Sequence, residues 1–443
     1  MSPEIFDLYN KVGLEIEAEN FQAANSILDK WQSRKGLTSY ESAMSYQMRG
    51  FIAYQQENLK KAIVEYRKIL QFPDIPYATT DSIRFNLAQF LSMENRFKES
   101  LSVLAEWFLY QPSPSAQQFF FKSQVHYQYG IELDKVARSK READQQFRLG
   151  IVEVERTINM GNADPLITIR ENWFQIQSAL YYQLEDYSKV RDILEIVIVQ
   201  WPRPQYWVQL SAMYSELRLL EKQLAVLDVA YRLGFLEKET NIVTIAQLYS
   251  INELPYLAAK VMENGMKPVM VDGQQVTLVD PEDEKNLTLL GQSYLVGRDY
   301  AKSTAPLAKA AELSEDGELY LQLGSVYNTL EDWKNAASSL QSAIDKSIVN
   351  NRRIDQANRA NRNDPDYKPE KKEALDQAYL YLGVAYVNFR EFGKAEKAFK
   401  DARRVAESGD KKIARQVRGW LSHITMEKQR LKRLAASGIT PSG

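Results

Sequence analysis

The chain has 443 residues, no cysteine, and 58 acidic side chains against 56 basic ones. The absence of cysteine excludes disulfides, thiolate metal sites and cysteine nucleophiles. The balanced charge gives no general attraction to nucleic acid or anionic lipid, and no apolar run approaches the ~20 residues of a membrane-spanning helix. We therefore expect neither a nucleic-acid partner nor a transmembrane segment.

Residues 1–160 are expected to form repeated pairs of helices, of which the fourth is irregular. Gly50 marks a first helix at a point where a small side chain allows a second helix to approach closely. A small residue, Ala62, follows after twelve positions, and a large one, Tyr66, follows four positions later on the same face. The segment 115–160 departs from this frame, because its second helix begins only after the charged stretch 135–142.

The same frame continues through residues 161–267. Ser178, Ser211 and Ala246 occupy the small position of successive first helices, at spacings of 33 and 35 residues. A period of about 34 residues is typical of a helix–turn–helix repeat. This region is therefore predicted to hold central repeats of the same kind.

An insert at residues 268–282 interrupts the period. The next small position, Gly291, comes 45 residues after Ala246, which is too far for one repeat. The surplus residues 268–279 contain β-branched side chains on both sides of Asp272-Gly273, a strong hairpin-turn signal. We predict a short β-hairpin in an inter-repeat loop.

Repeats resume at 283–349 and at 373–409, and these two regions flank a second insert at 350–372. The insert has seven basic residues and few apolar ones, so it is predicted to be a charged, mobile loop or a helix extension. Residues 410–443 are predicted to form a capping helix and a tail. One helix over 411–433 has an apolar side and a basic side, as the exposed end of a repeat array requires.

The sequence offers little chemistry for catalysis. Its two histidines, His126 and His423, lie far apart, and the common phosphate-binding, zinc-protease and serine-hydrolase motifs are missing. A lone histidine on a helix is most often packed or solvated. We expect a protein that is not an enzyme, with no catalytic residue, no cofactor and no metal.

The chain resembles tetratricopeptide repeat (TPR) proteins over most of its length. The motifs that carry this resemblance are Leu290-Gly291-x-x-Tyr294, Leu323-Gly324-x-x-Tyr327 and Leu382-Gly383-x-x-Tyr386. The resemblance implies an all-α, right-handed superhelical solenoid of about ten helix pairs with a C-terminal capping helix. It also implies a scaffold that binds a protein or peptide partner.

In that fold the first helices line a concave groove, and polar residues on them are candidates for partner binding. The alternative interpretation of each is an ordinary solvated side chain. The candidates are Gln175, Tyr182, Gln292, Asn328 and Asn388.

A narrower similarity concerns bacterial TPR proteins encoded beside TonB–ExbB–ExbD energy-transduction systems. The matching segments are Tyr206–Leu217, Lys222–Ala225, Pro255–Val261 and Ala414-Arg415-Gln416 before Trp420. This similarity implies a periplasmic adaptor in a Gram-negative bacterium that supports TonB-dependent uptake, whose partners include TonB-complex or other envelope proteins. Members carry an export signal, so the chain is expected to begin at a mature terminus. The alternatives are a cytosolic adaptor or co-chaperone-like regulator, and an accessory subunit of an envelope or peptidoglycan enzyme.

Overall fold

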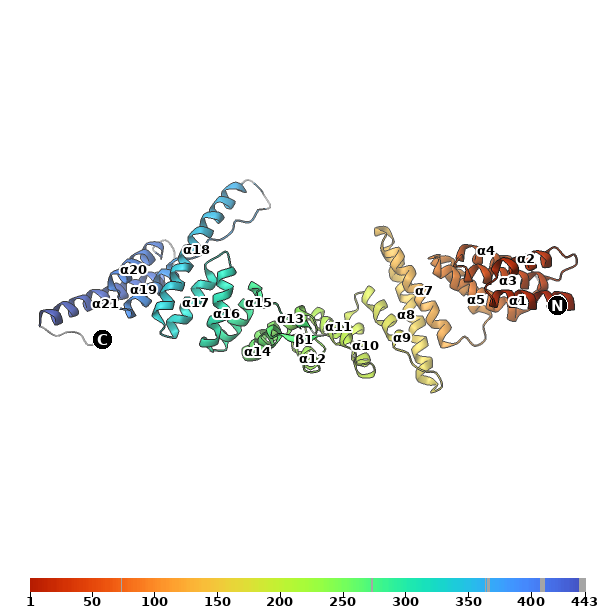
Figure 1. The fold of residues 1–443 in the computed structure, drawn as a ribbon, viewed down its shortest axis with the longest axis horizontal. Helices are drawn as coiled ribbons and strands as arrows, with labels where there is room; N and C mark the ends of the chain where they lie inside the picture. Colours follow the sequence, from red (N-terminus) through yellow and green to blue (C-terminus); the bar gives the residue numbers. More distant parts are fainter. Residues whose placement is uncertain (73, 272–273, 363, 365–366, 407–410, 438–443) are drawn as a thin grey trace. The chain divides into compact units, whose positions relative to one another are not determined.

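The structure is a computed structural model that describes every residue except 73, 272–273, 363, 365–366, 407–410 and 438–443 (Figure 1). The described residues form α-helices and one small two-stranded sheet. They divide into two compact units, Met1–Arg218 and Leu219–Gly443, here called unit 1 and unit 2. The all-α solenoid expected from the sequence is confirmed. No helix of the described residues is long and apolar enough to cross a membrane.

The described residues of unit 1 form the first eleven α-helices and a short 3₁₀ helix over Ala137–Ser139. The bounds are α1 Pro3–Glu17, α2 Phe21–Gln32, α3 Ser39–Gln55, α4 Leu59–Ile69, α5 Tyr77–Met93, α6 Phe97–Tyr110, α7 Ala116–Asp134, α8 Lys140–Ala163, α9 Glu171–Gln183, α10 Tyr187–Gln200 and α11 Pro204–Glu216.

In unit 2 the part of the chain that the structure describes forms ten further helices and two strands, β1 and β2. The bounds are α12 Leu220–Arg232, α13 Glu239–Ile251, α14 Pro255–Met266, β1 Val269–Val271, β2 Gln274–Val276, α15 Glu284–Val296, α16 Tyr300–Leu313, α17 Glu318–Thr329, α18 Trp333–Ala360, α19 Asp376–Asn388, α20 Phe392–Ala406 and α21 Lys411–Ala436. In chain order α1 to α20 make ten pairs; α11 and α12 belong to different units. We call the first helix of a pair the A helix and the second the B helix.

Several pairs are closed by a glycine of the A helix that faces a large side chain of the B helix. A Cβ built on Gly50 would lie 2.4 Å from the ring of Tyr66, and one on Gly324 would lie 2.4 Å from Leu340 Cγ. Gly383 meets Phe399 at 2.5 Å in the same way. No real Cβ fits at such distances, so the large side chain occupies the space that glycine leaves. This geometry confirms the frame of small and large positions inferred from the sequence.

The turn between A and B helices is also uniform. In nine of the ten pairs it is three residues long, and its middle residue has a φ between 56° and 61° although it is not glycine. The residues concerned are Glu19, Glu57, Asn95, Glu185, Arg218, Glu253, Arg298, Glu331 and Arg390. The left-handed residue lets the following N–H reach back to the A helix, as when Asp332 donates to the Tyr327 carbonyl at 2.9 Å. The Asp332 carboxylate then caps α18 by accepting from Asn335 N at 3.2 Å.

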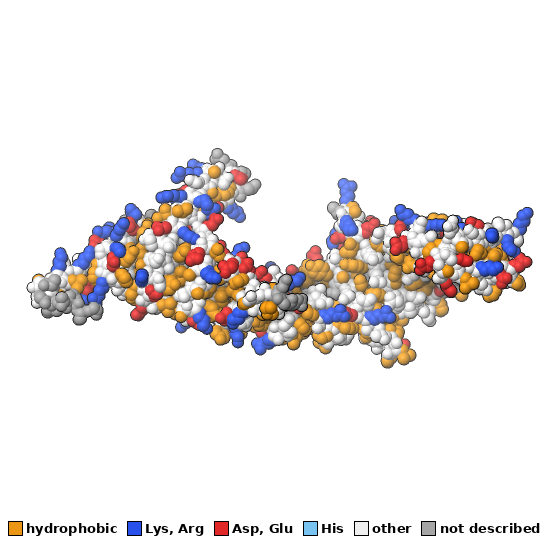
Figure 2. Space-filling model, viewed as in Figure 1, with side chains coloured by type: hydrophobic (Ala, Val, Ile, Leu, Met, Phe, Trp, Pro, Cys, Tyr) orange, Lys and Arg blue, Asp and Glu red, His pale blue; other side chains and the backbone are white. Residues whose placement is uncertain are grey.

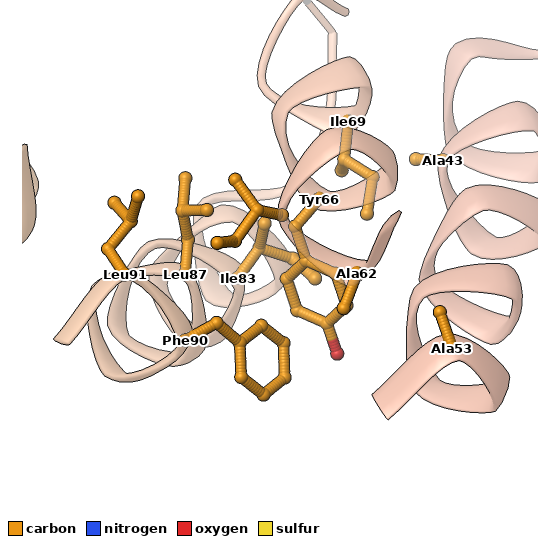
Figure 3. Close-up of a cluster of buried hydrophobic side chains, with 10 residues drawn as sticks. Ala43, Ala53, Ala62, Tyr66, Ile69, Ile83, Leu87, Phe90 and Leu91 are labelled. Carbon is orange, nitrogen blue, oxygen red and sulfur yellow. The ribbon is translucent and has the colours of Figure 1, made fainter. Parts of the chain in front are cut away.

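Consecutive pairs are joined by apolar packing between a B helix and the A helix that follows it (Figure 3). In one such cluster Tyr66 and Ile69 of α4 pack with Ile83, Leu87 and Phe90 of α5. The Tyr66 and Phe90 rings meet edge-on with centroids 5.1 Å apart. Each layer of the core is therefore shared between neighbours along the chain, which is the arrangement expected of a solenoid.

The hairpin predicted at 268–279 is present. β1 and β2 pair antiparallel, with Val269 opposite Val276. The proposed Asp272-Gly273 turn lies outside the described residues. The chain beyond the hairpin is held to α14, because Val279 is fully buried and its N–H donates to the Gly265 carbonyl at 2.9 Å.

The second insert follows the helix-extension alternative over its first part. Residues 350–360 are helical and extend α18, which in Figure 1 projects beyond α16 and α17. Ile354 is buried in this extension, and asparagines hold the returning segment: Asn351 exchanges two hydrogen bonds with the Glu373 backbone, at 2.8 and 3.0 Å. Asn358 accepts from Glu370 N at 2.9 Å. Asparagine amides thus satisfy backbone groups of the described return residues, which form neither helix nor strand.

The C-terminal helix α21 covers the last repeat of unit 2. Val417 and Ile424 of α21 are buried against that repeat. The Trp420 ring of α21 stacks on Phe399 of α20, with centroids 5.9 Å apart and an interplanar angle of 8°. Its outer side carries basic residues, and lysine and arginine side chains are interspersed with acidic ones over the face shown in Figure 2.

The close contact at Gly324 yields a stability prediction. Gly324→Ala forces its new methyl group against Leu340, so we expect unit 2 to lose about 1–3 kcal/mol of unfolding free energy. Gly419→Ala on α21 is the matched control, because nothing lies within 4 Å of a Cβ there. That change should stabilise the helix by about 0.5–1 kcal/mol. Hydrogen exchange of α17 and α18 measures the first effect and that of α21 the second, and wild-type protection of α17 and α18 in Gly324→Ala would contradict the packing frame.

A second prediction concerns acid stability at the start of α3. Glu41 accepts from Ser2 N at 2.6 Å and from Thr38 N at 3.0 Å, and these bonds lower its pKa to about 2. A lowered pKa means that the stabilisation is complete above the ordinary value of 4.5 and is lost as the pH falls toward 2. Glu41→Gln should cost about 1–2 kcal/mol at neutral pH and little at pH 2.

Thermal unfolding of the full chain as a function of pH measures this difference. Glu17→Gln, at an exposed site on α1, serves as the control and should leave the pH profile unchanged. A constant offset between Glu41→Gln and wild type at every pH would mean that the carboxylate charge is not what stabilises the N-terminus.

Candidate partner-binding groove

A hollow of about 630 Å³ lies in unit 1 on the A helices α9 and α11, with α10 beneath them; we call it the unit-1 groove. Its floor is apolar and buried: Phe174, Val190, Leu194, Val197 and Met213 are each at most 6% exposed. The remaining lining residues are Tyr127, Gln175, Ser178, Ala179, Tyr182, Gln183, Gln205, Tyr206, Gln209 and Ala212. A concave site with an apolar floor and a few polar groups is the usual form of a binding site.

Helix periodicity explains why these side chains converge. On α9, Gln175, Ser178 and Tyr182 are separated by three and four positions, so they share one helix face. On α11, Gln205 and Gln209 are four positions apart. Gln175, Tyr182, Gln205 and Gln209 are exposed, so these stripes are open to solvent.

One polar network borders the groove. Gln175 Nε2 donates to the Tyr206 hydroxyl at 2.6 Å, and that hydroxyl donates to Glu171. Arg203 pairs with the same carboxylate, its Nη2 lying 2.7 Å from Oε2. Burial, with Glu171 as acceptor, raises the pKa of Tyr206. The network fixes the position of the Gln175 side chain, and its two charged groups, Glu171 and Arg203, are paired with each other.

The spacing of successive A helices is fixed by hydrogen bonds from tyrosines to carboxylates of the preceding B helix. Tyr181 of α9 donates to Glu155 of α8 at 2.6 Å, and Tyr214 of α11 donates to Glu195 of α10. Burial is the main reason that the pKa of Tyr214 rises to about 12, and the Glu195 bond adds to it. In unit 2 the same bond joins Tyr249 of α13 to Asp228 of α12. These bonds set the width of the hollow between neighbouring A helices.

Two of the five residues proposed from the sequence, Gln175 and Tyr182, lie in the unit-1 groove. Gln292 lies in a separate hollow of about 330 Å³ in unit 2, within 3.4 Å of Gln322. Asn328 Nδ2 donates to the Tyr381 carbonyl at 3.2 Å and so ties α17 to α19. Asn388 is exposed and bonds its own helix at Val384 O, 3.0 Å away.

Sequence reasoning missed the contribution of α11. Gln205 and Gln209 stand on an A helix one repeat after Gln175, on a stripe that the same periodicity marks out. The periodicity signal was therefore present in the sequence. A single helix, however, does not show that its polar stripe borders a hollow formed with a neighbouring A helix.

The two histidines occupy ordinary positions. His126 is 6% exposed, its Nδ1 donates to Gln146 Oε1 at 2.8 Å, and burial lowers its pKa. His423 packs edge-on against Trp420 with centroids 5.8 Å apart. Over the described residues, no three His, Asp or Glu side chains are grouped so that they could hold a metal ion.

No family model and no curated protein matches this sequence. Among solved structures, YrrB, described as a TPR protein with an unusual peptide-binding site, is 17% identical with a TM-score of 0.35, covering 51% of this chain and 97% of that chain. MamA is 14% identical with a TM-score of 0.34, covering 46% and 92%. The TPR2AB domain of yeast Sti1, in a pHSP90 complex, is 15% identical with a TM-score of 0.29, covering 68% and 98%. Scores this low support no argument about function.

The position of Asn328 gives a prediction that separates stability from binding. Asn328→Ala removes the bond to the Tyr381 carbonyl, so unit 2 should lose about 1 kcal/mol. Asn388→Ala removes only an exposed bond within its own helix and should change stability little. Hydrogen exchange across α17 and α19 distinguishes them, and an Asn328→Ala protein with wild-type protection would show that this amide does not tie the repeats together.

Proposed function

We propose that this chain is a non-enzymatic scaffold that binds a segment of a partner protein in the unit-1 groove. The observation that carries the proposal is the combination of a buried apolar floor with an exposed polar rim on two adjacent A helices. An apolar side chain of a partner gains free energy when it leaves water for such a floor. The rim supplies hydrogen bonds that orient the segment.

The rim chemistry favours binding over catalysis. Its polar groups are carboxamides, phenols and the hydroxyl of Ser178. Amides and phenols near neutral pH position a ligand, whereas an enzyme needs a base, an acid or an activated nucleophile directed at one point. A segment held there would be positioned without being changed.

A finer part of the proposal concerns location and partner. The segments similar to TPR proteins encoded with TonB–ExbB–ExbD support a periplasmic adaptor whose partners are TonB-complex or other envelope proteins of a Gram-negative bacterium. The competing proposals are a cytosolic adaptor and an accessory subunit of an envelope or peptidoglycan enzyme. Fractionation of native cells with an antibody to this chain tests the location, and recovery in the cytosol would overturn the periplasmic proposal.

The groove itself is tested by filling it. Ala212→Arg places a long side chain in the hollow from the exposed side of α11, so the fold should survive while partner binding falls about tenfold or more. Ser215→Arg on the same helix is the matched control, since it is exposed and does not line the hollow.

The measurement begins with in-cell cross-linking and mass spectrometry, which name the partner. The affinity of purified wild type and both variants for that partner is then compared, with circular dichroism as the check on folding. If Ala212→Arg binds as tightly as wild type while folded, the partner uses another surface and the proposal is wrong.

A further inference from the structure

The fifteen residues that line the unit-1 groove include no lysine, arginine, histidine, aspartate or glutamate. Charged residues make up 26% of the chain, so a charge-free lining of this size is a marked departure from the general surface. The charges at its border, Glu171 and Arg203, neutralise each other across 2.7 Å. The groove therefore offers no counter-ion to an incoming charged side chain.

A second hollow in unit 1 has the same composition. It measures about 340 Å³ and is lined by Tyr54, Gln89, Phe90, Ser92, Met93, Phe121, Gln124 and Gln128. These residues come from α3, α5 and α7, and α7 also contributes Tyr127 to the unit-1 groove. The uncharged lining is thus shared by A helices from α3 to α11.

Unit 2 provides an internal contrast. The hollow that contains Gln292 is lined by three carboxylates, Glu284, Asp316 and Glu318, together with Lys285. The fold and the glutamines are the same, so the repeat architecture does not by itself require an uncharged lining. The lining of unit 1 is a property of its own residues.

The glutamines of the unit-1 groove carry unused hydrogen-bonding capacity. The side chains of Gln183, Gln205 and Gln209 make no hydrogen bond to another described residue, whereas Gln175 donates to Tyr206. A carboxamide has two N–H donors and an oxygen acceptor, which matches the donor and acceptor of a peptide group. An extended segment presents those backbone groups sideways, whereas a helix has already used them internally.

We infer that the unit-1 groove selects an extended segment of a partner protein whose inward-facing side chains are uncharged. The inference rests on the proposed function and adds the chemistry of the ligand. The buried floor takes an apolar side chain, and the glutamines bond the backbone on either side of it. A charged side chain is rejected because it would lose water without gaining a partner charge.

The test uses a random peptide library displayed on phage and selected on the immobilised full chain. We expect enriched peptides whose shared core contains Asp, Glu, Lys and Arg at about half or less of their frequency in the unselected library. Methylating the backbone nitrogens of a synthetic enriched peptide should weaken its binding about tenfold, because the peptide then has no N–H groups to donate to the carboxamide oxygens of the groove. An unchanged affinity would overturn the extended backbone contact.

Variants show whether the lining makes the selection. Gln205→Lys combined with Gln209→Lys should weaken the neutral peptide about tenfold and shift the enriched pool toward acidic sequences. Gln200→Lys is the control, since Gln200 is exposed at the end of α10, the helix before α11, and lies outside the groove. Circular dichroism confirms folding of all three proteins.

The outcomes separate this inference from the proposed function. One outcome is that enriched peptides compete with the partner but are as charged as the unselected library. It would overturn the charge selection and leave the groove as a binding site. A double variant whose pool equals that of wild type has the same consequence. No enrichment, together with partner binding that Ala212→Arg does not affect, would overturn both.

Discussion

One contact repeats through the molecule and the rest of the structure depends on it: a small residue of an A helix received by a large side chain of its B helix. Gly50 with Tyr66, Gly291 with Leu307, Gly324 with Leu340 and Gly383 with Phe399 are each sixteen residues apart, and each pair leaves no room for a Cβ. The contact brings two helix axes close and fixes their register. Once that register is set, the outer faces of successive A helices are aligned, and their stacking leaves a hollow between neighbouring A helices.

The sequence predicted this contact because its signal is local and steric. A glycine followed at a constant distance by a large apolar residue is visible without any knowledge of tertiary structure. The fourth pair shows the limit of that signal: Gly130 receives Phe147, with a Cβ distance of 2.3 Å, but the separation is seventeen residues because a 3₁₀ helix replaces the usual turn. A search at a fixed period passes over such a pair.

Other features were hidden because they depend on partners distant in sequence. Composition left a mobile loop and a helix extension both open at 350–372, because it does not show that Asn351 and Asn358 satisfy backbone groups of the returning chain. The positive φ of residues such as Glu57 and Arg298 is also unreadable from residue type, since neither is a residue that favours the left-handed region. The candidate site was half visible: Gln175 and Tyr182 follow from periodicity on one helix, whereas Gln205 and Gln209 matter only because α11 packs beside α9.

The A-to-B turn has a consequence for how this molecule can change in length. Nine such turns are three residues long, and the B-to-A connections range from three residues between α10 and α11 to seventeen between α14 and α15. A turn that must place a left-handed residue and then a helix cap tolerates neither insertion nor deletion, so both long inserts lie in B-to-A connections. Within each unit the edge formed by the A-to-B turns therefore has a fixed length, whereas the edge formed by the B-to-A connections accepts insertions. A reporter domain grafted between α14 and α15 would therefore extend an edge that already carries a hairpin, without disturbing the helix register on which the groove depends.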